Sequence, residues 1–354
     1  MSETRKRLKP TIVDVAKLAG TSIATVSRTL SGSSYPVSEA TRLNVTKAAE
    51  QLGYTPNLIG KMLKTNQSQT IGVLIPSFQN AFYIQIIHGI TKTATALGYT
   101  VLTFSSQRDV QQERTIINQM LQKQILGLMI ASVDTSSSTI SHYIENGGRA
   151  CIFESNFKDS HRFILAKTDM VESGRLAMNY LIEMGHSNIA IITTPLSKQS
   201  RRNTIKGCRY AMVDHGLEFT DEDIIIAPFE RELDDGLYEF EVGRDLVDLL
   251  INRVKKYTAI LAVNDLIACG IIKGLKKYGL SVPQDISVMG MDDIPLSSMI
   301  SPTLSTVHMP SYTLGQKACQ LMVDAMKEKE KRYGVALSIR PELVERESVK
   351  KLSR

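Results

Sequence analysis

Residues 11–32 read TIVDVAKLAGTSIATVSRTLSG, and this stretch decides how the first part of the chain folds. Thr11 and Asp14 have the spacing of a capping box, which marks the start of a helix. Gly20 ends that helix, and Ser22 supplies the N-cap of a second, shorter helix that runs to Leu30. The apolar residues of the first helix recur at helical spacing and form one face: Ile12, Val15, Ala16 and Ala19.

A third helix is predicted to begin near Ser38, with Val45, Ala48, Ala49 and Leu52 on one face. Two helices joined by a glycine turn and followed by a third are the plan of a helix-turn-helix domain. The second helix of such a domain enters the major groove of DNA with its N-terminal residues first. The alternative is a small three-helix bundle with a solvated basic face.

The outer face of the predicted second helix carries side chains suited to DNA. Its three hydroxyl side chains can reach phosphates or base edges, and the Arg28 guanidinium can fork onto guanine O6 and N7. Ile23 and Ala24 can contact a thymine methyl group or permit close approach. The predicted contacts of this helix are Ser22, Ile23, Ala24, Thr25, Ser27 and Arg28.

The charge distribution favours the same interpretation. Residues 1–70 hold ten of the 42 Lys and Arg and four of the 36 acids, so they carry the whole net charge of +6. The remaining 32 bases and 32 acids cancel. This asymmetry indicates a polyanion-binding head, either for nucleic acid or for an anionic membrane surface, on a neutral body. Charge does not choose between these partners, but the helical pattern favours DNA.

Residues 56–70 are predicted to form a linker between head and body. Pro56 suits the first position of a helix. The apolar stripe that follows covers only about eight residues, which is too short for a helix that is stable alone in water. We therefore expect this segment to fold only when something packs against it. The domains are predicted as 1–55 for the head, 56–70 for the linker and 71–354 for the body.

The body alternates short apolar runs with amphipathic stretches, which is typical of βαβ units and parallel sheets. About 280 residues predict two such sheets rather than one, so the fold class is α/β. The predicted strands are 71–75, 100–104, 125–131, 150–153, 164–168, 189–193, 224–227, 259–263 and 286–291. The predicted helices lie near 80–97, 110–122, 137–146, 172–184, 200–215, 241–256, 265–278 and 310–327.

Polar and aromatic residues follow several of these strands, where open parallel sheets bind ligands. The candidate clusters are Asn80–Tyr83, Asp169, Asn264–Asp265 and Asp292–Asp293. Aromatic faces combined with amide and carboxylate groups suit sugar recognition. Taken singly, each residue has a plainer explanation as a helix cap or a core residue.

The sequence gives little support to a membrane protein, a secreted protein, a metal-binding protein or an enzyme. No run of about 18 apolar residues is long enough for a membrane span, and the basic N-terminus has no apolar run behind it, so we expect a cytoplasmic protein. The four cysteines are far apart and no metal site is expected. No glycine-rich phosphate loop follows a strand, so no cofactor is expected. An enzyme using Asp292 and Asp293 as an acid pair would lack a nucleophile and a histidine partner.

The sequence resembles the lactose/galactose-repressor family of bacterial transcription regulators. Residues 11–32 and the segment from Val37 to Asn57 carry the resemblance in the head, and we count Asn57 among the DNA contacts. The resemblance implies that Leu63 wedges between the central base pairs of a near-palindromic operator, with Lys64 beside it in the minor groove. It also implies that the partner of the linker is the same segment of a second subunit.

The body resembles the family through segments such as NDLIACG at 264–270 and VPQDISVMGMDDIPL at 282–296. This implies a body like a periplasmic sugar-binding protein, with two subdomains, three chain crossings and a cleft. The residues implied at the cleft are Phe82, Tyr83, Asn264, Asp292 and, more weakly, Asp169. Two features depart from the family: Thr204 stands where many members have arginine, and residues 230–241 form an acidic stretch. Arg202 is our candidate to replace that arginine.

The sequence therefore predicts a homodimeric, DNA-binding regulator, a repressor of carbohydrate-utilisation genes switched by a sugar or sugar phosphate in the cleft. Two alternatives stay open at this point. One is a catabolite-control regulator that uses a phosphoprotein corepressor. The other is a soluble sugar-binding protein, which would have a signal peptide and no basic head.

Overall fold

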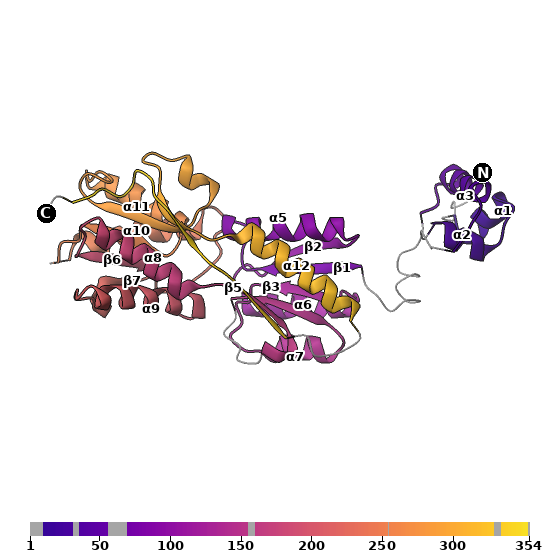
Figure 1. Cartoon of the computed structure of the whole chain (residues 1–354), viewed down its shortest axis with the longest axis horizontal. Helices are drawn as coiled ribbons and strands as arrows, with labels where there is room; N and C mark the ends of the chain where they lie inside the picture. The colour runs from indigo at the N-terminus through magenta and orange to yellow at the C-terminus, as the bar shows by residue number, and fades with distance from the viewer. Residues whose placement is uncertain are drawn as a thin grey trace, which may run out of the picture. The chain divides into compact units, whose positions relative to one another are not determined.

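The computed structural model describes residues 10–30, 35–55, 69–154, 160–253, 255–328 and 334–352. The chain divides into two compact units, Met1–Gln67 and Ser68–Arg354, here called the head and the body (Figure 1). Three residues predicted to contact DNA, Asn57, Leu63 and Lys64, lie outside the described residues. The fold class predicted from the sequence is confirmed in both units.

The described residues of the head form three helices, α1 (Ile12–Leu18), α2 (Ile23–Leu30) and α3 (Glu39–Leu52). The capping box of α1 is present, because the Thr11 amide donates to the Asp14 carboxylate at 2.8 Å. Gly53 ends α3 in the left-handed region, at φ +64°, which glycine adopts without strain. The apolar faces of the helices meet in one small core of Val15, Ala16, Val26, Val45, Ala48 and Ala49.

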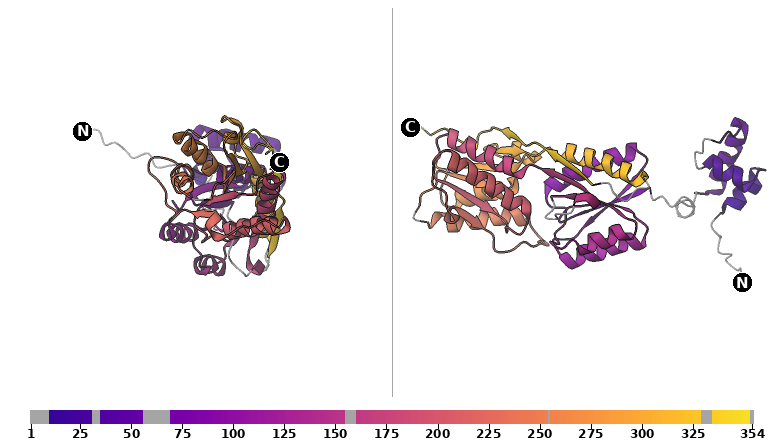
Figure 2. Two further views of the ribbon diagram at one scale, coloured as in Figure 1. Left: turned by 90° about the vertical axis from the view of Figure 1, so that its left-hand side faces the viewer. Right: turned by 60° about the horizontal axis from the view of Figure 1, so that its bottom comes forward.

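The first subdomain of the body is a six-stranded parallel sheet with the order β11-β5-β4-β3-β1-β2. Helices α5 and α12 pack together on one face of this sheet, and α6 and α7 cover the other (Figures 1 and 2). Its elements are β1 (Thr70–Ile75), α5 (Ala81–Ala96), β2 (Thr100–Ser105), α6 (Val110–Gln122), β3 (Gly127–Ile130), α7 (Ser138–Glu145), β4 (Arg149–Phe153), η1 (Ser160–Arg162), β5 (Ile164–Thr168), α12 (Ser311–Lys327) and β11 (Val335–Ile339).

The second subdomain repeats the plan with the order β12-β10-β9-β8-β6-β7, and only β12 is antiparallel to its neighbour. Helices α8 and α9 pack together, as do α10 and α11. Its elements are α8 (Met170–Glu183), β6 (Ile189–Thr193), α9 (Gln199–Asp214), η2 (Asp221–Asp223), β7 (Ile224–Ile226), α10 (Tyr238–Ile251), β8 (Ala259–Ala262), α11 (Asp265–Lys277), β9 (Ser287–Asp292), η3 (Pro295–Ser298), β10 (Ser305–His308) and β12 (Glu342–Val344).

The chain crosses between the subdomains three times: after β5, after β10 and after β11. All three crossings involve the same side of each sheet, because β5 and β11 are neighbours in the first sheet and β10 and β12 in the second. The opposite edges, β2 and β7, have no covalent connection to each other's subdomain. The cleft between the subdomains is therefore hinged along one side.

Three helix pairs in the body pack closely through reciprocal glycines. A Cβ atom on Gly174 of α8 would lie 2.2 Å from the Thr204 carbonyl oxygen, and one on Gly207 of α9 would lie 1.9 Å from that of Val171. The same reciprocity joins α10 to α11 through Gly243 and Gly270, and α5 to α12 through Gly89 and Gly315. Each pair brings two backbones together where any side chain would hold them apart.

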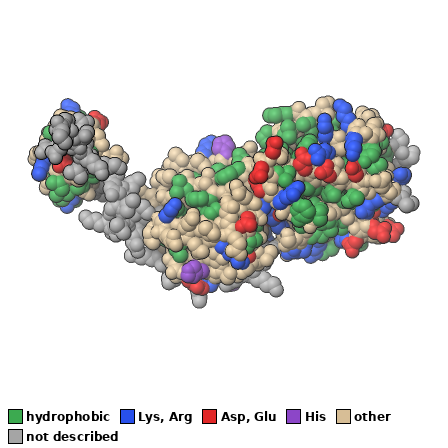
Figure 3. Space-filling model, turned by 180° about the vertical axis from the view of Figure 1, so that it is seen from behind, with side chains coloured by type: hydrophobic (Ala, Val, Ile, Leu, Met, Phe, Trp, Pro, Cys, Tyr) green, Lys and Arg blue, Asp and Glu red, His purple; other side chains and the backbone are tan. Residues whose placement is uncertain are grey.

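The surface of the body agrees with its balanced charge. On the face seen in Figure 3, acidic and basic side chains are interspersed over the second subdomain, and few lie on the first. That face offers no broad basic patch for a polyanion. In the part of the chain that the structure describes, no helix combines the length and the apolar character needed to cross a bilayer.

Candidate functional site

The exposed face of α2 is the first candidate site. Ser22, Ile23, Ala24, Ser27 and Arg28 are exposed, and Thr25 is half-buried. Val26 and Thr29, on the other side of the helix, are buried in the head. The predicted division of α2 into an inner apolar side and an outer polar side is therefore present.

Two local contacts order this face. The Ser22 hydroxyl caps α2 by accepting from the Thr25 amide at 3.1 Å, which leaves the first turn well formed. The Arg28 guanidinium lies 4.0 Å from the centre of the Tyr35 ring. Tyr35 is 55% exposed and was not predicted from the sequence, since it lies after the helix in a stretch without periodicity. A guanidinium held over a ring is presented in a restricted orientation.

The second candidate site is a cavity of about 190 Å³ between the two subdomains of the body. The first subdomain supplies the ends of β3 and β4, the start of α5 and the loop after β2. The second supplies the loops after β6 and β7. These are the carboxyl ends of parallel strands, as the topology requires.

Phe82 and Tyr83 both line this cavity. Asn80 caps α5 by accepting from the Phe82 amide at 3.0 Å, which positions the two rings at the start of the helix. The ring centres are 5.3 Å apart in an edge-to-face arrangement. Burial, together with the charge of Glu154, raises the pKa of the Tyr83 hydroxyl, so this group stays protonated and can donate a hydrogen bond.

Glu113 positions the wall formed after β3. Its side chain, 1% exposed, accepts from the Ser132 hydroxyl and from the amides of Val133 and Asp134, the latter two at 2.7 and 3.3 Å. Burial raises the pKa of Glu113, although these hydrogen bonds act to lower it. Sequence reasoning missed this residue, because a glutamate in the first turn of an amphipathic helix resembles an ordinary surface residue.

Asp292 and Asn264 lie at the ends of β9 and β8, outside the set of residues that line the cavity. Burial is the main cause that raises the pKa of Asp292, and the nearby charges of Asp265 and Glu154 add to it, whereas Arg201 opposes it. Asn264 is 1% exposed, and its Oδ1 caps α11 by accepting from the Ile267 amide at 2.8 Å. Within the described residues, its buried Nδ2 has no hydrogen-bond partner.

The neighbouring carboxyls have structural roles. Asp265 is fully buried and accepts from the Ser297 and Thr306 hydroxyls at 2.6 Å each, while burial raises its pKa to about 7. Asp293 pairs with His308 at 2.9 Å and with Arg346 at 2.6 Å. Asp292 and Asp293 are adjacent in the sequence, but their carboxyl groups therefore lie in different environments.

The structure places Asp169 and Arg202 away from the cavity wall. Asp169 is exposed at the first crossing and caps α8 by accepting from the Glu172 amide at 3.1 Å. Arg202 is exposed and donates to the Ser197 carbonyl at 2.7 Å, which ties down the loop before α9. Thr204 is buried against α8.

Arg201, the neighbour of Arg202, is the arginine directed toward the cleft. Its guanidinium donates to the Thr194 hydroxyl and to the Val263 carbonyl, each at 3.2 Å. Its charge acts on the pKa values of Tyr83 and Asp292. The sequence did not distinguish Arg201 from Arg202, because adjacent helical residues differ in direction only once the helix packing is known.

These two sites define a class of protein: a helix-turn-helix DNA-binding head joined to a hinged, two-subdomain ligand-binding body. The family model described as bacterial regulatory proteins, lacI family, matches residues 11–57. The model of a periplasmic binding protein-like domain matches residues 178–349. The HTH-type transcriptional repressor PurR of Aliivibrio fischeri (strain ATCC 700601 / ES114) is 32% identical over 341 residues, 96% of this chain and 98% of that protein.

The PurR protein of Vibrio atlanticus (strain LGP32) is 31% identical over 97% of this chain and 99% of its own length. Among solved structures, the lac repressor dimer bound to operator and the anti-inducer ONPF is 26% identical, with a TM-score of 0.82 over 97% of this chain and 100% of that one. A complex of the regulator CelR with cellobiose shares the fold at 24% identity, with a TM-score of 0.71 over 96% and 99%. The chain belongs to the lacI family of bacterial regulatory proteins, and it is a DNA-binding transcriptional regulator.

Proposed function

We propose that this regulator is a homodimeric repressor that binds a near-palindromic operator and is switched by a small molecule in the body cleft. The exposed face of α2 carries the DNA part of the proposal, because it projects from the unit that bears the whole net charge of the chain. Two copies related by two-fold symmetry would read two half-sites. A chromosomal operator places the protein in the bacterial cytoplasm.

The linker at 56–70 completes the proposed operator complex. Folding of this segment over the minor groove, with Leu63 as an apolar wedge and Lys64 beside it, would bend the central base step. Asn57 would add a contact at the start of the linker. This assignment rests on the family resemblance of residues 37–57 and on the apolar stripe in the linker.

The unpaired Nδ2 of Asn264 supports the effector part of the proposal. A buried polar atom without a partner is costly unless a ligand supplies one. Arg201 lies near enough to Asp292 for its charge to act on the pKa of that carboxyl, and Phe82 and Tyr83 offer aromatic faces across the cleft. Amide, carboxyl, guanidinium and ring together suit a polyhydroxylated ligand.

The hinge gives the proposed switch its two states. A ligand that binds the closed cleft more tightly than the open one shifts the equilibrium by that difference in affinity. The linkers of both subunits leave the body at the first subdomain, so closure would change whether both can fold on one operator. Coupling of this kind is typically about 1–3 kcal/mol and acts equally in both directions. The proposal contains no catalytic step.

The test begins with operator selection from random DNA, followed by thermal-shift screening of sugars and sugar phosphates on the full chain. With operator and ligand in hand, Arg201→Ala is compared with Arg202→Ala. We expect Arg201→Ala to lose the ligand response and to keep ligand-free operator affinity, whereas Arg202→Ala keeps both. Equal loss of response in the two variants, or none in either, would move the effector site away from the cleft.

A further inference from the structure

The acidic stretch noted in the sequence lies across the side of the cleft opposite the hinge. Residues 230–239, here called the strap, run from the loop after β7 to the first turn of α10. They contact the loops after β1 and β2, where no covalent crossing occurs. The Ser77 hydroxyl donates to Glu232 at 2.7 Å, Gln79 donates to the Leu233 carbonyl at 3.0 Å and Asn80 donates to Glu239 at 3.1 Å.

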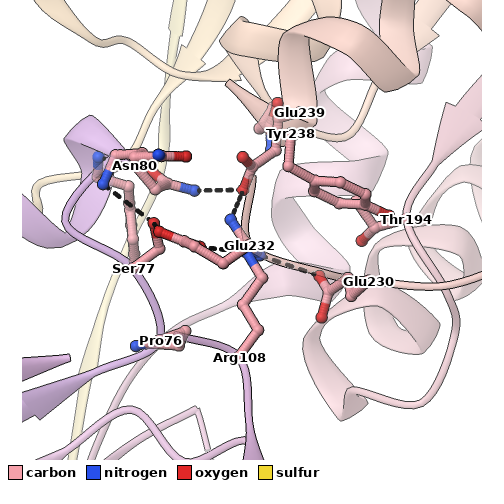
Figure 4. A network of polar contacts seen from close by, with 12 residues as sticks. Pro76, Ser77, Asn80, Arg108, Thr194, Glu230, Glu232, Tyr238 and Glu239 are labelled. Carbon is pink, nitrogen blue, oxygen red and sulfur yellow. Dashed lines mark hydrogen bonds and ion pairs between the residues drawn. The ribbon is translucent and has the colours of Figure 1, made fainter. Parts of the chain in front are cut away.

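Arg108 lies at the centre of these contacts (Figure 4). Its guanidinium pairs with Glu230 at 3.6 Å, with Glu232 at 3.1 Å and with Glu239 at 2.7 Å, and its side chain is 3% exposed. One positive charge from the first subdomain is thus surrounded by three negative charges from the second. Burial alone would lower the pKa of Arg108, but the charges of Glu239 and Glu230 outweigh burial and raise it.

The strap also forms an ion pair with the second basic residue of the cavity wall, Lys198. The Lys198 ammonium pairs with the second oxygen of Glu230 at 3.1 Å. Burial would raise the pKa of Glu230, but Lys198 and Arg108 outweigh burial and lower it, so Glu230 stays ionised at neutral pH. Both bases that line the cavity, Arg108 and Lys198, are therefore already paired with strap carboxylates.

The other charged side chains that line the cavity, Glu154 and Asp134, are acidic. Glu154 lines the cavity, and its charge raises the pKa values of both Tyr83 and Asp292. Asp134, another wall residue, is held by Arg114 at 2.8 Å. An entering anion would meet Glu154 and Glu230, and both bases of the cavity wall are already engaged by carboxylates. Arg201, outside this wall, donates to the Thr194 hydroxyl and the Val263 carbonyl.

We infer that the strap is a specificity element, which makes the cleft accept uncharged polyhydroxylated ligands and reject ligands that carry a phosphate or carboxylate group. The inference rests on the proposed role of the cleft as the effector site. Binding sites reject a ligand by placing a like charge against it as well as by withholding favourable contacts. The strap carboxylates occupy the positions at Lys198 and Arg108 that the anionic group of a ligand would need.

The test uses Glu230→Gln, which keeps the shape of the side chain and releases Lys198 from its counter-ion. Inorganic phosphate is the probe, and calorimetry on the full chain is the measurement. We expect the variant to bind phosphate at least about tenfold more tightly than the unmodified protein, since a unit charge at contact distance has a larger effect than this at a protein surface. Glu230→Gln combined with Lys198→Gln should lose the gained affinity.

Glu241→Gln is the matched control, because Glu241 lies just after the strap, in the first turn of α10, but pairs with Arg244 of the same helix rather than with a base of the cavity wall. It should bind phosphate no better than the unmodified protein. Equal phosphate affinity in Glu230→Gln and the unmodified protein would overturn the inference, as would a gain in the control or a gain that survives Lys198→Gln. Should Glu230→Gln fail to fold, Glu232→Gln replaces it with the same expected direction. Operator binding is measured separately, so failure of the regulator proposal would be visible on its own.

Discussion

Arg28 is the residue of the head whose role depends most on its side chain. Its place on the exposed face of α2, stacked on Tyr35, leaves the planar guanidinium oriented rather than freely rotating. We expect Arg28→Ala to weaken binding to the selected operator by about 1–3 kcal/mol and to relax the preference at one base pair in each half-site. Fluorescence anisotropy with single-base operator variants measures both effects. A uniform loss across all sequences would instead assign Arg28 to a phosphate.

His308 gives the body a pH dependence at the second crossing. Its ring bonds Asp293 at 2.9 Å, which raises the pKa of His308 above 6.5 and lowers that of Asp293 below 3.8, while Glu342 favours and Arg346 opposes the protonated ring. The stabilisation by His308 is present below its unfolded pKa and is lost as the pH rises through the raised folded pKa. That of Asp293 is present above 3.8 and is lost as the pH falls through its lowered pKa.

We therefore expect His308→Gln to destabilise the body at pH 5.5 and to have less effect at pH 9. The difference should be on the order of 0.5 kcal/mol, since the ring is 38% exposed and solvent screens the pair. Urea unfolding of both proteins at the two pH values measures it. An effect that does not change with pH would show that His308 acts through packing rather than through its charge.

Individual site residues were predicted unevenly from the sequence. Phe82 and Tyr83 could be placed at the cleft because they follow a strand and because the family resemblance covers them. Arg108, Glu230 and Glu239 could not, since they come together only when two edge strands from different subdomains face each other. The acidic stretch was visible in the sequence, but its partner, about 120 residues earlier in the chain, was not.

At the scale of elements, strands with buried apolar runs were predicted within a few residues. Three strands were not predicted, β10, β11 and β12, and each of them adjoins the second or the third crossing. Most residues of β11 and β12 are exposed or half-buried, so they lack the continuous apolar run that marks a central strand. β10 is mostly buried, but three of its four residues, STVH, are polar, and one of them, Thr306, bonds the buried Asp265.

The reciprocal glycines make a prediction about helix packing. In Gly207→Ala, the new methyl group would meet the Val171 carbonyl at 1.9 Å, so α8 and α9 must separate. We expect a loss of about 1–3 kcal/mol in the free energy of unfolding, as for other overpacked sites. Lys206→Ala, at the exposed neighbouring position on α9, should cost less than about 0.5 kcal/mol. Urea midpoints that coincide for the two variants would contradict the packing argument.

At the scale of the whole molecule, the separation of a basic head from a neutral body predicts how binding depends on salt. We expect the logarithm of operator affinity to fall linearly with the logarithm of salt concentration, with a slope of about −0.9 for each phosphate neutralised. Binding of an uncharged effector to the body should show almost no such slope. Anisotropy and calorimetry over the same series of KCl concentrations compare the two. A flat operator curve would contradict the role of the head.

The three crossings also determine when each subdomain can be completed during synthesis. β11 pairs with β5 in the first sheet, yet it is made 167 residues after β5 ends. At about 5–20 residues per second, roughly 8–33 s pass on the ribosome between the synthesis of β5 and the synthesis of its neighbour β11. An unpaired strand edge is a template for aggregation. Nascent chains of this regulator, and products truncated before residue 335, should therefore depend on chaperones that shield the first sheet.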